Sequence, residues 1–377
     1  MKIAINTRFL LKDGLEGVGW VSYELLRRIV RDHPKDEFLF IFDRPYDESF
    51  VFGPNVRPIV IGPQARHPLL WYYWFERSLP RLLRREQPDL FFSLDGYCSL
   101  RTQVPTSLLI HDIAHQHFPD QVPWVSRHYY HHFVPRFLRR AERVLTVSHF
   151  TKADIVRRYA IAPDKITVVH NGSRKGFRVI EAAEQVAVRQ RYAKGKPYFF
   201  YVGAVHPRKN IHRLIEAFDH FKERTGASHQ LLIGGRFAWQ TGTIRSAYEN
   251  ARHRDAIQLL GYLDETQHFR LMGASLAFDY LSVNEGFGLP VLEALHAEVP
   301  VVTTRRSSLP EVAGEAALYV ENPEDTQEIA RALERVSSDA SLRRDLIARG
   351  RRQREQFSWE RAAQQVYDQL RELYRGP

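Results

Sequence analysis

Two glutamates, Glu285 and Glu293, lie eight positions apart in the stretch NEGFGLPVLEA at residues 284–294. Carboxylates accept hydrogen bonds from hydroxyl groups, and both sugars and riboses carry hydroxyls in pairs. With a diphosphate between them, one carboxylate could hold a sugar and the other a ribose. The same spacing also fits a tight turn between a strand and a helix, with a surface glutamate at each end.

The residues between the two glutamates indicate the start of a helix. Pro290 has a preset φ and lacks an N–H, which suits a first helical position, so the helix is expected to begin near Leu289. The backbone N–H groups of Phe287, Gly288 and Leu289 would gather at its N-terminus, where the helix dipole favours an anion. Gly286 and Gly288 allow close approach to the backbone. The stretch therefore predicts a phosphate site.

Two cations, Arg208 and Lys209, lie in the stretch VGAVHPRKN at residues 202–210, between a predicted strand and a predicted helix. Lysine offers a point charge and arginine a planar fork, and together they suit a diphosphate. A solvated basic loop is the alternative interpretation of this stretch taken alone.

Two glycines, Gly17 and Gly19, lie in the stretch EGVGW at residues 16–20, where the first predicted helix opens. They would let the backbone approach a phosphate or a sugar. The pattern is shorter than a dinucleotide-binding fingerprint, so a plain flexible turn is the alternative.

Three histidines, His111, His115 and His117, follow the predicted strand at 106–110. His111 and Asp112 close this strand, so we expect His111 to donate a hydrogen bond to a substrate at the carboxyl edge of the sheet. The three histidines also resemble a metal cluster, but no cysteine or glutamate at a familiar ligand spacing supports it. We therefore expect no metal site.

Composition narrows the class of protein. The 377 residues suffice for two domains, and the one cysteine, Cys98, excludes an intrachain disulfide. The chain lacks an apolar run long enough to span a membrane, and its first ten residues lack the design of a signal peptide. The formal net charge is +10, of which residues 1–176 carry +8. A basic first half indicates an anionic partner, with a solvated charged surface as the alternative. Nucleic acid is disfavoured because no nucleic-acid-binding signature appears.

Short apolar runs alternate with amphipathic stretches along the whole chain, which is typical of doubly wound α/β domains with parallel sheets. We predict an N-terminal Rossmann-like domain at 1–176, a linker at 177–197, a C-terminal Rossmann-like domain at 198–355 and a C-terminal helix at 356–377 that packs back on the first domain. The expected strands lie at 2–6, 38–42, 57–61, 89–93, 106–110, 144–147, 166–169, 198–203, 230–235, 257–262, 275–280, 300–304 and 317–320.

Taken together, these motifs resemble the retaining glycosyltransferases of family 4, also called group 1, most of all their bacterial mannosyltransferase- and glucosyltransferase-type members. The resemblance covers nearly the whole chain. It implies the GT-B fold, in which two Rossmann-like domains face a central cleft. The stretches that carry it are GVGWVSYELLRRI, IHDIAHQHFP, VLTVSHFTKADIVRRYAIAPDKITVVHNG, YFFYVGAVHPRKNIHRLIEAF, LLGYLDE, NEGFGLPVLEA and SSLPEVAGEAALYV.

The resemblance also implies roles for residues of the second domain. Glu293 would bind the ribose hydroxyls of a nucleotide-sugar donor, and Glu285 the hydroxyls of the transferred sugar, beside the Phe287, Gly288 and Leu289 backbone. Arg208 and Lys209 would neutralise the diphosphate. Tyr262, after Gly261, would line the pocket of the base.

In the first domain, the resemblance places Gly17 and Gly19 over the phosphates and His111 near the anomeric carbon. It implies a reaction without a metal and with retention of configuration, and no cofactor besides the donor substrate. The hexose would come from a donor of the GDP-mannose or the UDP-glucose type and go to a glycan or a lipid-linked acceptor in polysaccharide biosynthesis. Two alternatives stay open: a nucleotide-sugar 2-epimerase on the same fold, and a non-catalytic scaffold that binds glycan or anionic lipid.

The stretch HPLLWYYWFERSLPRLLRREQPD at 67–89 combines aromatic and basic residues. It fits an interfacial membrane helix, or an acceptor-binding face, and its leucines equally fit a helix packed on the first sheet. We expect a cytoplasmic protein, with peripheral contact between the basic N-terminal domain and an anionic membrane as an open alternative. The sequence does not specify the oligomeric state.

Overall fold

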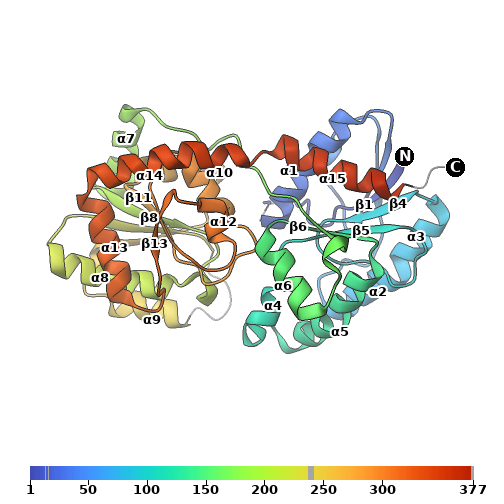
Figure 1. Cartoon of the computed structure of the whole chain (residues 1–377), viewed down its shortest axis with the longest axis horizontal. Coiled ribbons are helices and arrows are strands. Elements are labelled where there is room, and N and C mark those ends of the chain that lie inside the picture. Colours follow the sequence, from blue (N-terminus) through green and yellow to red (C-terminus); the bar gives the residue numbers. More distant parts are fainter. Residues whose placement is uncertain (13, 16, 237–241, 375–377) are drawn as a thin grey trace. The chain divides into compact units, whose positions relative to one another are not determined.

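The computed structural model describes residues 1–12, 14, 15, 17–236 and 242–374. It divides into two compact units. The first unit holds residues 1–171 together with the C-terminal stretch from Ser358 onward, and the second holds Gly172–Phe357. Each unit has helices packed against a parallel sheet (Figure 1).

The sheet of the first unit has the strand order β3-β2-β1-β4-β5-β6-β7, and each neighbouring pair runs parallel. Its central strands are buried on both faces because helices cover both sides, which explains their continuous apolar runs. The strands are β1 (Lys2–Asn6), β2 (Glu37–Phe42), β3 (Val56–Val60), β4 (Leu90–Ser93), β5 (Thr106–Ile110), β6 (Arg143–Thr146) and β7 (Ile166–Val168).

The longer helices of the first unit bury apolar side chains against the core. In α1, Val21, Leu25 and Ile29 recur every four residues and are 1% exposed, so one face of this helix meets the core. The helices are α1 (Gly17–Asp32), α2 (Pro68–Tyr73), α3 (Leu79–Glu86), α4 (Ala114–His117), α5 (Trp124–Arg140), α6 (His149–Tyr159) and α15 (Trp359–Leu373), and the π-helical turn η2 (Trp74–Ser78) joins α2 to α3.

The last helix, α15, packs on the first unit. The ring of Tyr367 stacks on His33 with centroids 3.3 Å apart, and its hydroxyl donates to Asp36 at 2.7 Å. Arg28 of α1 bonds Glu360 at 3.0 Å. These contacts tie the end of the chain to α1 and to the loop that follows it.

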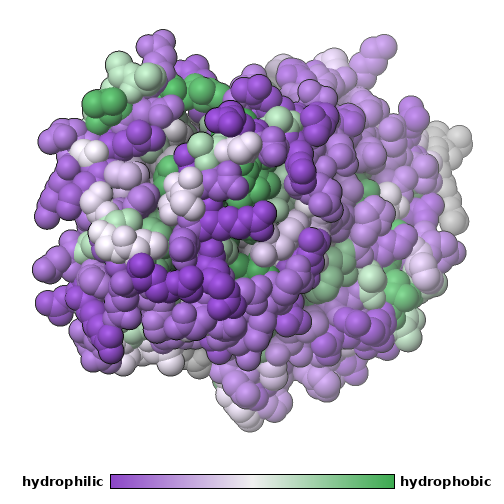
Figure 2. Space-filling view, turned by 60° about the vertical axis from the view of Figure 1, so that its left-hand side comes forward, coloured by the Kyte–Doolittle hydropathy of each residue, from purple (hydrophilic) through white to green (hydrophobic). Residues whose placement is uncertain are grey.

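The aromatic stretch at 67–89 divides between core and surface. Trp74, Phe75 and Leu79 are fully buried against the first sheet, whereas Leu69 is 71% exposed and Tyr73 47% exposed. None of the helices described has an apolar run long enough to cross a bilayer. On the face that Figure 2 shows, hydrophilic residues predominate and apolar residues form small separate groups.

The sheet of the second unit has the strand order β10-β9-β8-β11-β12-β13, again with parallel neighbours. The predicted fold class of two doubly wound α/β units is thereby confirmed. The strands are β8 (Tyr198–Val202), β9 (Gln230–Gly234), β10 (Ile257–Gly261), β11 (Ala277–Tyr280), β12 (Val301–Thr304) and β13 (Ala317–Val320). The helices are α7 (Ala182–Ala193), α8 (Ile211–Thr225), α9 (Gly242–Asn250), α10 (Glu265–Ala274), α11 (Leu289–His296), α12 (Leu309–Ala313), α13 (Thr326–Ser338) and α14 (Ala340–Gln353), and the 3₁₀ turn η5 (Pro207–Lys209) precedes α8.

The segment 177–197, predicted as a linker, contains the helix α7 and is part of the second unit. It packs against α10: Arg189 donates to the carbonyl of Ala274 at 2.9 Å, and Glu184 pairs with Arg270 at 2.8 Å. Its dense charge belongs to a helix that lies on the surface of this unit.

Candidate functional site

The strand order of the second unit reverses between β8 and β11, and open α/β sheets bind ligands outside the carboxyl ends of the strands at such a reversal. The loop after β8 carries Arg208 and Lys209 in η5, and the loop after β11 carries Glu285. The two loops meet, since Val283 donates its N–H to the carbonyl of Arg208 at 3.0 Å. The fold thus brings together residues that are about 76 positions apart in the sequence.

Lys209 and Glu285 form a buried ion pair at this edge of the sheet. The ammonium of Lys209 donates to a carboxylate oxygen of Glu285, and also to the hydroxyl of Tyr280 at 2.8 Å. Arg208 lies on the other oxygen of Glu285, with nitrogen and oxygen 3.6 Å apart, and donates to the carbonyl of Asn284. Glu285 is 7% exposed and Lys209 9%.

The two cations keep Glu285 ionised. Burial by itself raises the pKa of Glu285, but the charges of Lys209 and Arg208 and the hydrogen bond from Lys209 outweigh burial and lower this pKa to about 2. Two cations around one carboxylate leave a net positive charge, which suits an anionic ligand.

The start of α11 is shaped by the loop at 307–308. Gly288 has φ +101°, a conformation that glycine adopts without strain, and a Cβ there would lie 2.9 Å from Leu309. Ser308 donates to the carbonyls of Glu285 and Phe287 at 2.9 Å each. The first backbone bond of α11 runs from Val291 to the carbonyl of Gly288, so the N–H groups ahead of Val291 lack an acceptor within the helix.

Glu293 faces a different set of residues. It is 2% exposed and accepts a hydrogen bond from Arg174 at 2.7 Å. His268 of α10 lies 3.9 Å from its other oxygen and 3.3 Å from a guanidinium nitrogen of Arg174. The sequence analysis missed Arg174 and His268, because neither belongs to a phosphate or sugar motif. The one available signal was the positive charge of Arg174, which lies in the sequence just after the boundary between the two units.

Tyr262, predicted to line a base pocket, follows β10 and is 54% exposed. The guanidinium of Arg236 lies 4.6 Å from the centre of its ring. An exposed aromatic ring can stack on a flat heterocycle, and the role of Tyr262 in binding a base stays a prediction.

In the first unit, His111 follows β5 and its Nε2 lies 2.7 Å from the carbonyl of Leu94. Burial lowers the pKa of His111, so the ring is neutral at pH 7. The two glycines differ: a Cβ on Gly17 would meet no atom within 4 Å, whereas one on Gly19 would lie 2.7 Å from the carbonyl oxygen of Phe9. Gly19 is therefore required for packing, and Gly17 leaves open space.

The first unit also has a buried ion pair at its own strand-order reversal, between β1 and β4. Arg8 bonds Asp95 at 2.6 Å, and Asn6 donates to the same carboxylate at 2.9 Å. The guanidinium lies about 5 Å from the centres of the Phe75 and Tyr97 rings. The sequence analysis missed this pair, since it assigned no role to Arg8 or to Asp95.

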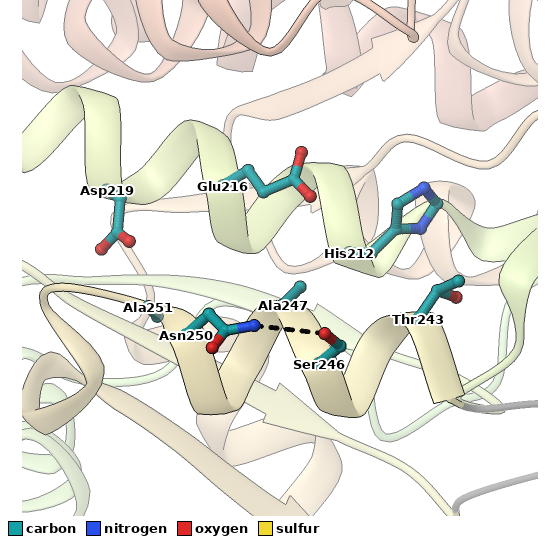
Figure 3. Close-up of a pocket in the computed structure, with 8 residues that line it drawn as sticks. All are labelled: His212, Glu216, Asp219, Thr243, Ser246, Ala247, Asn250 and Ala251. Atoms are coloured by element: carbon teal, nitrogen blue, oxygen red, sulfur yellow. Dashed lines mark hydrogen bonds between the residues drawn. The ribbon is translucent and has the colours of Figure 1, made fainter.

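A separate pocket of about 370 Å³ lies between α8 and α9 in the second unit (Figure 3). Polar side chains and two alanines line it, and Asn250 donates to Ser246 at 3.2 Å along the wall formed by α9. Its lining includes none of the predicted site residues. The lining residues are His212, Glu216, Asp219, Thr243, Ser246, Ala247, Asn250 and Ala251.

Comparisons with known proteins agree with the fold and the motifs. Family models described as "Glycosyltransferase Family 4" and "Glycosyl transferases group 1" match residues 15–173 and 184–353. O-antigen chain mannosyltransferase B of Escherichia coli is 32% identical over 97% of this chain and 98% of its own length. O-antigen chain mannosyltransferase RfbU of Salmonella typhimurium is 25% identical over 76% of each chain.

Among solved structures, Anabaena HepE in complex with UDP and glucose superposes with a TM-score of 0.74 at 15% identity, covering 99% of this chain and 100% of that one. This likeness concerns the fold. The chain belongs to the group 1 glycosyltransferases of family 4 and is a glycosyltransferase with the GT-B fold.

Proposed function

We propose that this glycosyltransferase moves a mannosyl group from a nucleotide diphosphate sugar to a glycan or lipid-linked acceptor of a surface polysaccharide, with retention of configuration and without a metal. Two relatives named as O-antigen mannosyltransferases support the sugar and the pathway class. GDP-mannose is the first donor to test, and a donor of the UDP-glucose type the second.

The buried Glu285–Lys209 pair is the observation that carries this proposal. A carboxylate that stays ionised beside two cations at the β8–β11 edge can accept bonds from sugar hydroxyls while the cations face a diphosphate. The start of α11 adds backbone N–H groups to the same region. Glu293, four residues further along α11, is assigned to the ribose.

The chemistry follows from these charges. Cleavage of the bond between the sugar and the diphosphate places negative charge on the departing phosphate, and Arg208, Lys209 and the start of α11 would stabilise that charge. The acceptor hydroxyl would pass its proton to the departing phosphate oxygen as it attacks from the same face. From the family resemblance, His111 is assigned to the transferred sugar, and Gly17 and Gly19 to the phosphates.

We also propose peripheral contact of the first unit with an anionic membrane. Leu69 and Tyr73 of α2 and Trp124 and Val125 of α5 are exposed, and α2 packs on α5 through Tyr72 and Phe133. Exposed apolar and aromatic side chains on a basic unit are typical of interfacial binding. Cosedimentation with vesicles of phosphatidylglycerol and with neutral vesicles tests this contact, and equal binding to both would contradict it.

The experiment for the donor site is calorimetric binding of GDP, UDP and ADP to the wild type and to Lys209→Ala, in EDTA and in magnesium. We expect one nucleotide to bind the wild type equally in both buffers and Lys209→Ala to lose this binding. Absence of binding by every nucleotide would remove the proposal's support. Binding that needs magnesium would overturn its metal-free part.

A further inference from the structure

Glu293 lies in a buried cluster with Arg174 and His268, and no sequence motif predicted this cluster. Arg174 donates through Nε to Glu293 at 2.7 Å and through Nη2 to Nδ1 of His268 at 3.3 Å, and its guanidinium lies 4.9 Å from the centre of the Phe177 ring. The exposed fraction of the side chain is 2% for Glu293 and 12% for both Arg174 and His268. The cluster thus fixes both ends of the guanidinium.

The state of His268 follows from its contacts. Burial and the charge of Arg174 lower the pKa of His268 to about 3, so the ring is neutral at physiological pH. An arginine always donates, so Nδ1 must be the acceptor and the proton must lie on Nε2. That Nε2 has no hydrogen-bond partner among the residues described, and it lies 3.9 Å from the second carboxylate oxygen of Glu293. The neutral ring of His268 therefore orients Arg174 through a hydrogen bond and adds no second positive charge beside it.

Opposing influences act on the charge of Glu293. Burial raises the pKa of Glu293, whereas the charge and the hydrogen bond of Arg174 lower it. The effect of burial is larger, so the pKa of Glu293 lies above its ordinary value. Glu265, at the start of α10, raises it further and lies 4.0 Å from Arg174. Arg174 is thus the cation that acts against protonation of a carboxylate buried in this environment.

We propose that Arg174, oriented by His268, is a positioning residue for the nucleotide donor: its hydrogen bond aims the carboxylate of Glu293 so that it can accept hydrogen bonds from the ribose hydroxyls, and its charge acts against protonation of that carboxylate. This inference rests on the proposed function, because it takes Glu293 as the ribose ligand. It adds a residue that acts through Glu293 rather than on the donor itself.

The test is the pH dependence of nucleotide affinity, measured by calorimetry between pH 5 and pH 9 with the nucleotide that the wild type binds. Arg174→Gln removes the cation, so Glu293 should stay protonated to higher pH. Affinity at pH 6 should then fall, by about tenfold for each unit by which the pKa of Glu293 comes to lie above 6. Affinity should recover toward pH 9. Arg174→Lys should keep the wild-type pH profile, since it keeps the charge.

Two comparison variants separate this role from a general loss of structure. Glu293→Gln should bind weakly at every pH, because the amide does not titrate, and adding Arg174→Gln to it should cost little more. Arg224→Gln, which breaks an exposed pair with Glu334 in the same unit, is the matched control and should behave as the wild type.

If Arg174→Gln does not fold, Glu265→Gln provides a second test, because Glu265 raises the pKa of Glu293 whereas Arg174 lowers it. It removes an exposed negative charge, so the loss of affinity at low pH should move to lower pH. A wild-type pH profile in Arg174→Gln, or an unmoved profile in Glu265→Gln, would overturn the inference while leaving the donor site in place. A wild type that binds no nucleotide would overturn the donor site itself.

Discussion

Lys209 and Glu285 meet as a buried ion pair although they come from two loops that follow different strands, β8 and β11. Removal of one partner leaves the other charge buried without full compensation, which costs about 3–5 kcal/mol in measured cases. We therefore expect Lys209→Met to lower the free energy of unfolding by an amount near the lower end of that range, since Arg208 still lies beside Glu285.

The decrease in the free energy of unfolding is measured from the urea-induced unfolding transition of the second unit. The control is Arg224→Gln, whose pair with Glu334 lies at the surface and should contribute at most about 1 kcal/mol. Equal effects of the two substitutions would mean that burial does not strengthen the Lys209–Glu285 pair.

The lowered pKa of Glu285 predicts how stability depends on pH. The folded-state pKa of about 2 is below the ordinary value of 4.5, so the stabilisation is complete above about pH 4.5 and is lost as pH falls toward 2. The shift corresponds to roughly 3 kcal/mol. Glu285→Gln lacks this titration, so the difference in unfolding free energy between wild type and variant should shrink between pH 5 and pH 2.5. A constant difference over that range would contradict the prediction.

Strand edges explain why Glu285, Lys209 and Arg208 could be found from the sequence. Each follows a clear apolar strand, and parallel strands end at one edge of the sheet, so the topology alone brings their loops together. The same logic placed His111 after β5 in the first unit. These predictions need only the strand positions and the strand order.

The contacts of Glu293 could not be predicted in that way. Arg174 and His268 approach it from a connecting segment and from α10, and neither lies at the end of a strand. The Arg8–Asp95 pair was missed for a related reason. Both residues follow strands, but only the folded structure shows that the two buried charges pair with each other. Side-chain pairing within a folded unit is a three-dimensional property that residue spacing does not encode.

The carboxyl of Asp279, in the middle of β11, is fully buried and neither of its oxygens has a hydrogen-bond partner among the residues described. Burial raises the pKa of Asp279 well above its usual value, so the folded state holds it protonated. The unfolded chain ionises it above about pH 4, so its unfavourable effect on stability grows as pH rises from there toward the folded-state pKa.

We therefore expect Asp279→Val to stabilise the protein at pH 8 by about 1–3 kcal/mol, since it removes an unsatisfied buried polar group and suits a strand. Thermal unfolding at pH 5 and pH 8 should show a larger gain at pH 8. Asp345→Asn, an exposed change on α14, is the control and should show no such difference. A variant that is less stable than the wild type at both pH values would mean that the Asp279 carboxyl is satisfied.

Gly17 and Gly19 differ in the space beside them, although both were expected to face phosphates. A Cβ on Gly19 would lie 2.7 Å from the carbonyl oxygen of Phe9, so Gly19→Ala should destabilise the protein by about 1–3 kcal/mol through overpacking. A Cβ on Gly17 meets no atom within 4 Å, so Gly17→Ala should leave stability unchanged or raise it by up to about 1 kcal/mol. Thermal unfolding of both variants separates the two cases.

The KM for the donor, measured on the same preparations, tests whether Gly17 faces the donor. A raised KM in Gly17→Ala, with wild-type stability, would identify the open space at Gly17 as part of the donor site. An unchanged KM would assign both glycines to the fold alone.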